Sequence, residues 1–125
     1  MKRVSVLVIV CGFFLFIVSV KVFSASTDRD IIPMIKLKFV PYLTAGGSIM
    51  EATFTIDNQS SYDIKDIEIT CTHSAKSGTE IDSNTRTIYD IVKAKKKKTF
   101  KNFNMGFVHS QVSTTSCRIV DLKAF

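Results

Sequence analysis

The chain has 125 residues, with 17 lysines and arginines against 11 aspartates and glutamates, a formal net charge of +6 at pH 7. The first 26 residues contain three of the basic residues and no acid, so residues 27–125 carry only 14 − 11 = +3. This mild excess does not indicate a nucleic-acid-binding protein. The length remaining suits one small domain rather than two.

The N-terminal segment, residues 1–26, has the order of a secretory signal peptide. Two basic residues precede an apolar run from Val4 to Val20, and small residues follow at positions 24–26. This order predicts export to the periplasm or the extracellular space. An uncleaved signal anchor stays open, because the 17 residues of the run, at about 1.5 Å each, almost span a bilayer core of about 30 Å.

Two cysteines remain if this segment is removed, because Cys11 lies inside the apolar run. An even number of cysteines in an exported chain predicts a disulfide, here between Cys71 and Cys117. Closing this loop of about 45 residues stabilises the fold by roughly 4 kcal/mol in the chain-entropy model.

Residues 27–125 alternate between apolar and polar side chains, which is the period of a half-buried strand. The first such stretch ends near Pro41, and turn residues follow several of the others. Residues 79–92 fit either two strands around a bulge or an irregular crossing. The predicted strands are 35–39, 50–57, 67–72, 98–103 and 113–122.

Parity within these strands predicts which side chains face the core. Cys71 points inward with its neighbouring isoleucines, and Cys117 shares a face with Ile119, whereas Val120 and Leu122 favour the opposite face. Short strands separated by turns indicate an all-β, antiparallel sandwich or open barrel. We therefore expect one β-sandwich domain over residues 27–125, after an N-terminal signal or anchor helix.

The stretch from residue 49 to residue 101 resembles the FxLYD-type family of small exported bacterial immunoglobulin-like domains. Its order of strand, Asn-x-Ser turn, aliphatic strand and Gly-containing hairpin is similar to Phe54–Ser60, Ile67–Cys71 and Ser77–Ile81, followed by Lys98-Thr99-Phe100. The motif that names the family is absent, and Lys95–Lys98 replaces its usual Pro-Gly turn. The resemblance implies an immunoglobulin-like sandwich in the cell envelope, with a binding role and no catalytic residues.

A lysine cluster is the most unusual surface feature of the sequence: Lys93, Lys95, Lys96, Lys97 and Lys98. Five ammonium groups within six residues are expected at the surface. One interpretation is a solvated turn that keeps a sheet edge soluble. The other is contact with an anionic surface such as a membrane.

Two further constellations predict sites of other kinds. Phe103, Met105 and Phe107 share one parity, so they either line a partner groove or join the core. A second set, Cys71, His73, His109 and Cys117, has the residue types of a zinc site, with a disulfide as the competing interpretation. In the second case the histidines are expected to be partly exposed.

No catalytic motif is present, because the sequence contains no G-x-S-x-G, no H-E-x-x-H and no Gly-rich phosphate loop. The residues predict an exported, non-enzymatic interaction module that needs no cofactor and binds a protein partner in the envelope. The alternatives are a membrane-anchored accessory subunit of a larger complex and, less favoured, a zinc-binding protein.

Overall fold

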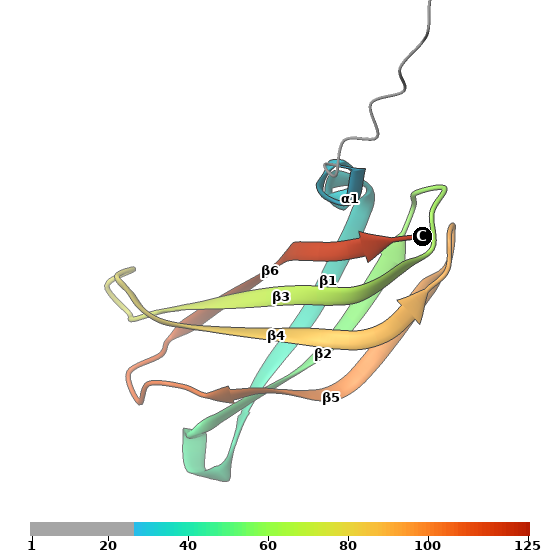
Figure 1. Ribbon diagram of the computed structural model, residues 1–125. Coiled ribbons are helices and arrows are strands. Elements are labelled where there is room, and N and C mark those ends of the chain that lie inside the picture. Colours follow the sequence, from blue (N-terminus) through green and yellow to red (C-terminus); the bar gives the residue numbers. More distant parts are fainter. Residues whose placement is uncertain (1–26) are drawn as a thin grey trace, which may run out of the picture.

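Six β-strands account for most of residues 27–125, the part of the chain that the computed structural model describes (Figure 1). The predicted signal or anchor segment, residues 1–26, lies outside the described residues. A short helix, α1 (Thr27–Asp30), and a 3-10 turn (Ile32–Met34) precede the first strand. The strands are β1 (Ile35–Thr44), β2 (Ile49–Asn58), β3 (Ile64–Ser74), β4 (Glu80–Val92), β5 (Lys97–Phe107) and β6 (Thr114–Ala124).

The strands form two three-stranded antiparallel sheets, in the orders β1-β2-β5 and β4-β3-β6. Hairpins join β1 to β2 and β3 to β4 within a sheet. The β2–β3, β4–β5 and β5–β6 connections cross from one sheet to the other (Figure 1). The predicted all-β class and sandwich-like arrangement are therefore confirmed.

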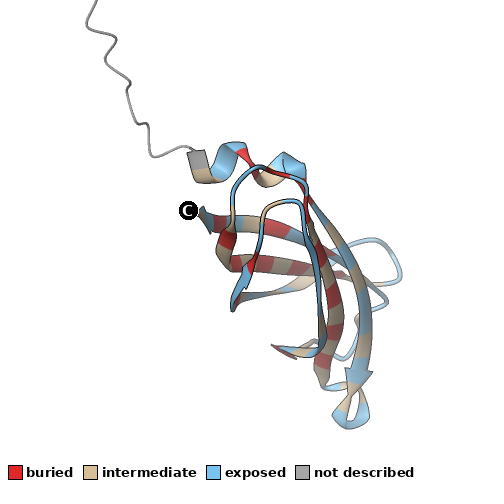
Figure 2. Cartoon of the chain, turned by 90° about the vertical axis from the view of Figure 1, so that its right-hand side faces the viewer, coloured by how far each residue is buried: buried red, intermediate tan, exposed pale blue. Residues whose placement is uncertain are grey.

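The core lies between the central strands β2 and β3, along which buried and half-buried residues alternate (Figure 2). This is the predicted period of two, and it fixes the register, because a slip by one residue would turn every buried side chain outward. Each large apolar side chain buried in this way contributes about 1.5–3 kcal/mol. The fully buried apolar residues of the two strands are Met50, Ala52, Phe54, Ile56, Ile64, Ile67, Ile69 and Cys71.

Strand β1 continues through Pro41 to Thr44, so the prediction that it ends near Pro41 is wrong. Pro41 pairs in register with Ala52 of β2. A proline is tolerated here because β1 is an edge strand, where the missing N–H can face away from the neighbouring strand.

The predicted face of Leu122 is also wrong, because Leu122 is buried with Cys117 and Ile119. Ile119 of β6 pairs with Ile69, but Asp121 pairs with the next residue of β3, Glu68. One extra residue therefore lies in β6 between these pairs. Such a bulge reverses the parity of every residue beyond it, which returns Leu122 to the core.

Residues 79–92, which the sequence left open, form one irregular strand, β4. Lys65 and Ile67 of β3, two positions apart, pair with Ile91 and Ile88 of β4, three positions apart. The first of the two interpretations, strand and bulge, is thus close to the structure. Asp66 of β3, with φ 48°, lies at the same level of the sheet.

Candidate functional site at the N-terminal end of the sandwich

The two cysteines are register partners on neighbouring strands, Cys71 on β3 and Cys117 on β6. Both are buried, and their sulfur atoms lie at disulfide distance, 2.03 Å. The predicted pairing agrees with this geometry, and the bridge joins two strands of the same sheet. It leaves no thiolate for the alternative zinc site.

The two histidines lie apart and differ in exposure. His73 is fully buried, so the expectation that it is partly exposed is wrong. Its Nε2 lies 2.6 Å from Oδ1 of Asn84, and its Nδ1 lies 2.8 Å from the hydroxyl of Thr115. His109 is exposed, and its Nδ1 accepts a hydrogen bond from the Gln111 N–H. Among residues 27–125, no three His, Cys, Asp or Glu side chains gather as a metal site would require.

The predicted groove of Phe103, Met105 and Phe107 does not form. Met105 is fully buried, and Phe103 packs edge-on against Phe54 with ring centroids 6.0 Å apart. Phe107 is 76% exposed. The reason is a bulge in β5, where Met50 and Glu51 of β2 pair with Gly106 and Asn104, so that Met105 is the extra residue.

The predicted lysine cluster lies where the chain crosses from β4 to β5. We call residues 93–98 the lysine turn. The Lys96 N–H donates to the Lys93 carbonyl at 3.1 Å, and Lys95 adopts a left-handed conformation with φ 60°. All five lysines are exposed, as the sequence predicted.

The β2–β3 loop, residues 59–63, holds the lysine turn in place. A carboxylate oxygen of Asp63 accepts the Ala94 N–H at 2.8 Å, and the Gln59 carbonyl accepts Lys95 Nζ at 2.6 Å. The Asn58 N–H donates to the Lys96 carbonyl at 2.9 Å. These contacts fix the backbone of the turn and leave most of its ammonium groups in solvent.

Asn58, the last residue of β2, anchors this loop with a fully buried side chain. Its amide nitrogen donates to the carbonyls of Tyr62, at 2.7 Å, and Val92, at 3.1 Å. Its oxygen accepts the backbone N–H and the hydroxyl of Ser60. Since its amide is buried and hydrogen-bonded, the Asn-x-Ser sequence serves here as a structural turn rather than as an exposed glycan acceptor.

Charge pairing divides the five lysines into two groups. Lys98 Nζ lies 3.0 Å from a carboxylate oxygen of Asp90, and the pair spans the seam between the two sheets. The hydrogen bond from Lys98, followed by the one from the Ile91 N–H, holds the pKa of Asp90 below its usual value of 3.8. Lys97 lies opposite Asp57 in the β2–β5 register. Within the described residues, no carboxylate lies within 4.0 Å of the ammonium groups of Lys93, Lys95 or Lys96.

A hollow of about 370 Å³ opens beside the lysine turn, between the end of β4 and the start of β5. Ile91 and Val92 supply its apolar lining, and lysine side chains surround them. Such a mixture suits a ligand with a negative headgroup and an adjoining apolar part. Its lining residues are Asp90, Ile91, Val92, Lys93, Lys96, Lys97 and Lys98.

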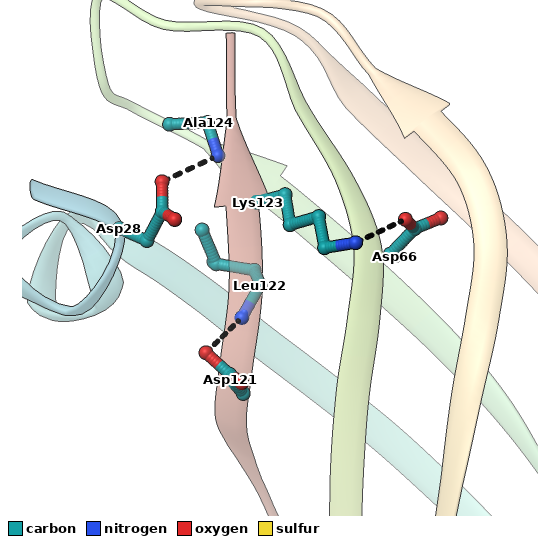
Figure 3. Close-up of polar contacts among 6 residues, drawn as sticks. All are labelled: Asp28, Asp66, Asp121, Leu122, Lys123 and Ala124. Atoms are coloured by element: carbon teal, nitrogen blue, oxygen red, sulfur yellow. Dashed lines mark hydrogen bonds and ion pairs between the residues drawn. The ribbon is translucent and has the colours of Figure 1, made fainter. Parts of the chain in front are cut away.

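The start of the described chain lies at this same end of the sandwich, which we call the N-terminal end (Figure 1). A carboxylate oxygen of Asp28 in α1 accepts the Ala124 N–H at 2.9 Å, beside the Lys123–Asp66 ion pair at 3.5 Å (Figure 3). The Met34 carbonyl accepts the Gln59 N–H at 3.2 Å. The residues just before β1, the lysine turn and Phe125, whose N–H donates to the Asp63 carbonyl at 3.0 Å, therefore all meet around the β2–β3 loop.

Comparison with protein-family models, curated proteins and solved structures found no match. No helix within residues 27–125 is long and apolar enough to cross a membrane.

Proposed function

We propose that the chain is an exported, non-enzymatic immunoglobulin-like module that binds a protein partner in the cell envelope. The observation that carries the proposal is the strand order of the two sheets. Strands β1, β2 and β5 are arranged as strands A, B and E of an immunoglobulin-like sandwich, and β3 and β6 as strands C and F. Strand β4 pairs with β3 as strand C′ does in the variable type.

The disulfide supports the export part of this proposal. Disulfides persist in oxidising compartments and are rare in the cytosol. The bridge joins the C-like and F-like strands within one sheet, whereas antibody domains join strands B and F across the sheets. The likeness to antibody domains thus concerns the arrangement of strands and not the position of the bridge.

Exposed apolar side chains on the strands support the binding part. Val40 on β1, Tyr89 on β4 and Phe107 on β5 are 65%, 83% and 76% exposed. All three strands are edges of their sheets, and an edge can bind an extended peptide through its free backbone groups.

The test is expression of the full chain in a bacterial host, followed by fractionation and thiol alkylation without reduction. We expect the protein in the envelope fraction with Cys71 and Cys117 protected from alkylation. A photo-crosslinker at Tyr89 or Phe107 should then capture one discrete protein. Cytoplasmic protein with two reactive thiols, or no cross-linked protein from either position, would contradict the proposal.

A second candidate, a membrane-anchored accessory subunit, is favoured by the position of α1, which lies at the same end of the sandwich as the lysine turn. A retained N-terminal segment would bring this end of the sandwich to the bilayer. Intact mass of the isolated protein separates the two candidates, because an anchored subunit retains residues 1–26 and a released module lacks them.

A further inference from the structure

We infer that the N-terminal end of the sandwich is a docking surface for the anionic phospholipid surface of a membrane. The lysine turn contacts lipid phosphates, and the apolar side chains beside it enter the headgroup region. This inference goes beyond a protein-binding role, because it assigns a lipid partner and a fixed orientation to the domain.

The charge available for this contact comes from the lysines that have no acidic partner. Four of the carboxylates at this end, those of Asp28, Asp63, Asp66 and Asp90, accept backbone N–H groups or pair with a lysine. The negative charges of these four carboxylates therefore interact with groups of the protein itself. The positive charges of Lys93, Lys95 and Lys96 remain available to an anionic surface, and Lys97 follows them in the sequence. Lysines near an anionic bilayer surface each strengthen binding by roughly fivefold.

The hollow beside the turn gives this charge a specific geometry. Lys93, Lys96 and Lys97 border a space whose apolar lining comes from Ile91 and Val92. Three lysine side chains border this recess, and their combined positive charge suits a phosphate, which offers several acceptor oxygens. The apolar lining matches the glycerol and acyl carbons that follow the phosphate in a phospholipid.

Exposed apolar side chains lie at the same end as the lysine turn, on or next to the β2–β3 loop that holds it, and a merely solvated turn would not need them. Met34, Tyr62 and Phe125 are 54%, 46% and 56% exposed. Lys65 Nζ lies 4.8 Å from the centre of the Phe125 ring, on the same end. Aromatic rings and long lysine side chains are favoured at the bilayer interface, where an apolar body meets a polar head.

The covalent path of the chain leads to the same orientation. The apolar part of the N-terminal segment extends to Phe23, only four residues before Thr27. Four residues span at most about 14 Å. If that segment is inserted in a bilayer, the end that carries Thr27 must face the bilayer, and the lysine turn lies at that end.

The test uses tryptophan fluorescence, since the chain has no tryptophan of its own. Phe125→Trp reports on the N-terminal end, and Phe107→Trp on the far end is its matched control. The full chain is reconstituted into vesicles whose acyl chains carry bromine, a quencher of tryptophan. One set of vesicles contains phosphatidylcholine alone, and the other adds phosphatidylglycerol.

We expect the Phe125→Trp signal to be quenched more strongly in the anionic vesicles and the Phe107→Trp signal to stay unquenched in both. Replacing Lys93, Lys96 and Lys97 by serine should lower the docked-to-undocked ratio, calculated from the quenching, at least about tenfold. The matched triple replacement of Lys38, Lys76 and Lys101, exposed lysines outside the turn, should change it less than about twofold.

Equal quenching of the two reporters, or equal quenching of Phe125→Trp in neutral and anionic vesicles, would overturn the inference. So would equal effects of the two triple replacements. None of these outcomes depends on the compartment, the thiol state or the protein partner, so the inference and the proposed function can fail separately.

Discussion

The two ends of the sandwich are built in different ways. At the far end, short connections close through nearby backbone bonds, such as Gly78 N–H to the Ala75 carbonyl and Ser48 N–H to the Thr44 carbonyl. At the N-terminal end, side chains join segments that are distant in the sequence. Asn58 reaches Val92, and Asp28 reaches Ala124. Turn chemistry closes the two hairpins of the far end. The β5–β6 connection there, like the N-terminal end, depends on distant segments, since the Val108 N–H donates to the Ser48 carbonyl at 2.9 Å and the Ser113 N–H to the Ser74 carbonyl at 2.8 Å.

Buried polar residues lie at both ends, Asn58 and Ser60 at the N-terminal end and His73 near the far end, and the partners of Asn58 and His73 differ. Asn58 binds backbone carbonyls and a serine of the loop that holds the lysine turn. His73 lies near the far end and binds side chains of the two neighbouring strands in its own sheet. The amide nitrogen of Asn84 continues this chain to the Phe107 carbonyl in the other sheet, at 2.8 Å.

The largest expected effect on stability comes from removing the disulfide that joins β3 to β6. Replacing Cys71 and Cys117 by alanine should lower the free energy of unfolding by about 4 kcal/mol, because the unfolded chain regains the entropy of a closed loop. Urea denaturation of residues 27–125 within the full chain measures this, with the reduced wild-type protein as the control. A loss below about 1 kcal/mol would show that the bridge adds little to stability.

Removing the buried amide of Asn58 at the N-terminal end should have the second-largest effect on stability. Asn58→Ala removes the amide donor to the Tyr62 and Val92 carbonyls and the acceptor of the Ser60 N–H and hydroxyl. We therefore expect a loss of roughly 3 kcal/mol in unfolding free energy. Hydrogen exchange of the Ala94 and Lys96 amides should rise as the lysine turn loosens. The matched control is Gln59→Ala, whose exposed side chain contacts only Asp57. Equal losses for the two variants would contradict this role of Asn58.

Removing the buried imidazole of His73 near the far end should lower the free energy of unfolding by a smaller amount. His73→Leu leaves Oδ1 of Asn84 and the hydroxyl of Thr115 without a partner, but both residues are only half-buried, so water can replace part of the bonding. We expect a loss of about 1–2 kcal/mol, measured by the same denaturation. His109→Leu on the exposed loop is the control and should change stability by less than about 0.5 kcal/mol. A loss larger than that of Asn58→Ala would reverse the order of the two ends.

The smallest expected effect concerns the ion pair at the edge of the lysine turn. Because Lys98 and the Ile91 N–H hold the pKa of Asp90 below 3.8, the ionised form is favoured by the fold. The Lys98–Asp90 pair therefore stabilises the fold fully at pH values above 3.8. This contribution is lost as the pH falls through the lowered pKa of Asp90. Both side chains are exposed, so Asp90→Asn should cost no more than about 0.5 kcal/mol at neutral pH. An NMR titration of Asp90 in the wild type and in Lys98→Ser checks the direction, since the pKa should rise in the variant.

The difference between the two ends also explains what the sequence could predict. Strands β2 and β3 follow from strict alternation, and the disulfide follows from two inward cysteines. The surface position of the lysine turn is predictable from its charges, but the contacts that fix it are not, because Asp63 and Ala94 lie 31 residues apart. The contact of Asp28 with Ala124 at the same end spans 96 residues and is equally unpredictable. The Asn-x-Ser turn was the one local signal of the loop that joins them.

Bulges account for the errors of parity. A single extra residue in β6 moved Leu122 into the core, and one in β5 separated Met105 from Phe107. Alternation read from a sequence assumes an unbroken ladder, and a bulge depends on the partner strand. The burial of His73 has a related cause, since its partners Asn84 and Thr115 come from two other strands.

The position of the disulfide has a mechanical consequence. The described chain enters and leaves at the same end, at Thr27 and Phe125, so a pull on these two residues would peel the sandwich open from that end. The 46 residue steps between Cys71 and Cys117 are closed by the bridge and cannot extend. Of the 98 steps from Thr27 to Phe125, only 98 − 46 = 52 can lengthen under tension. Strand β4, the lysine turn and β5 all lie within the closed loop, so this pull cannot extend their backbone while the bridge is intact.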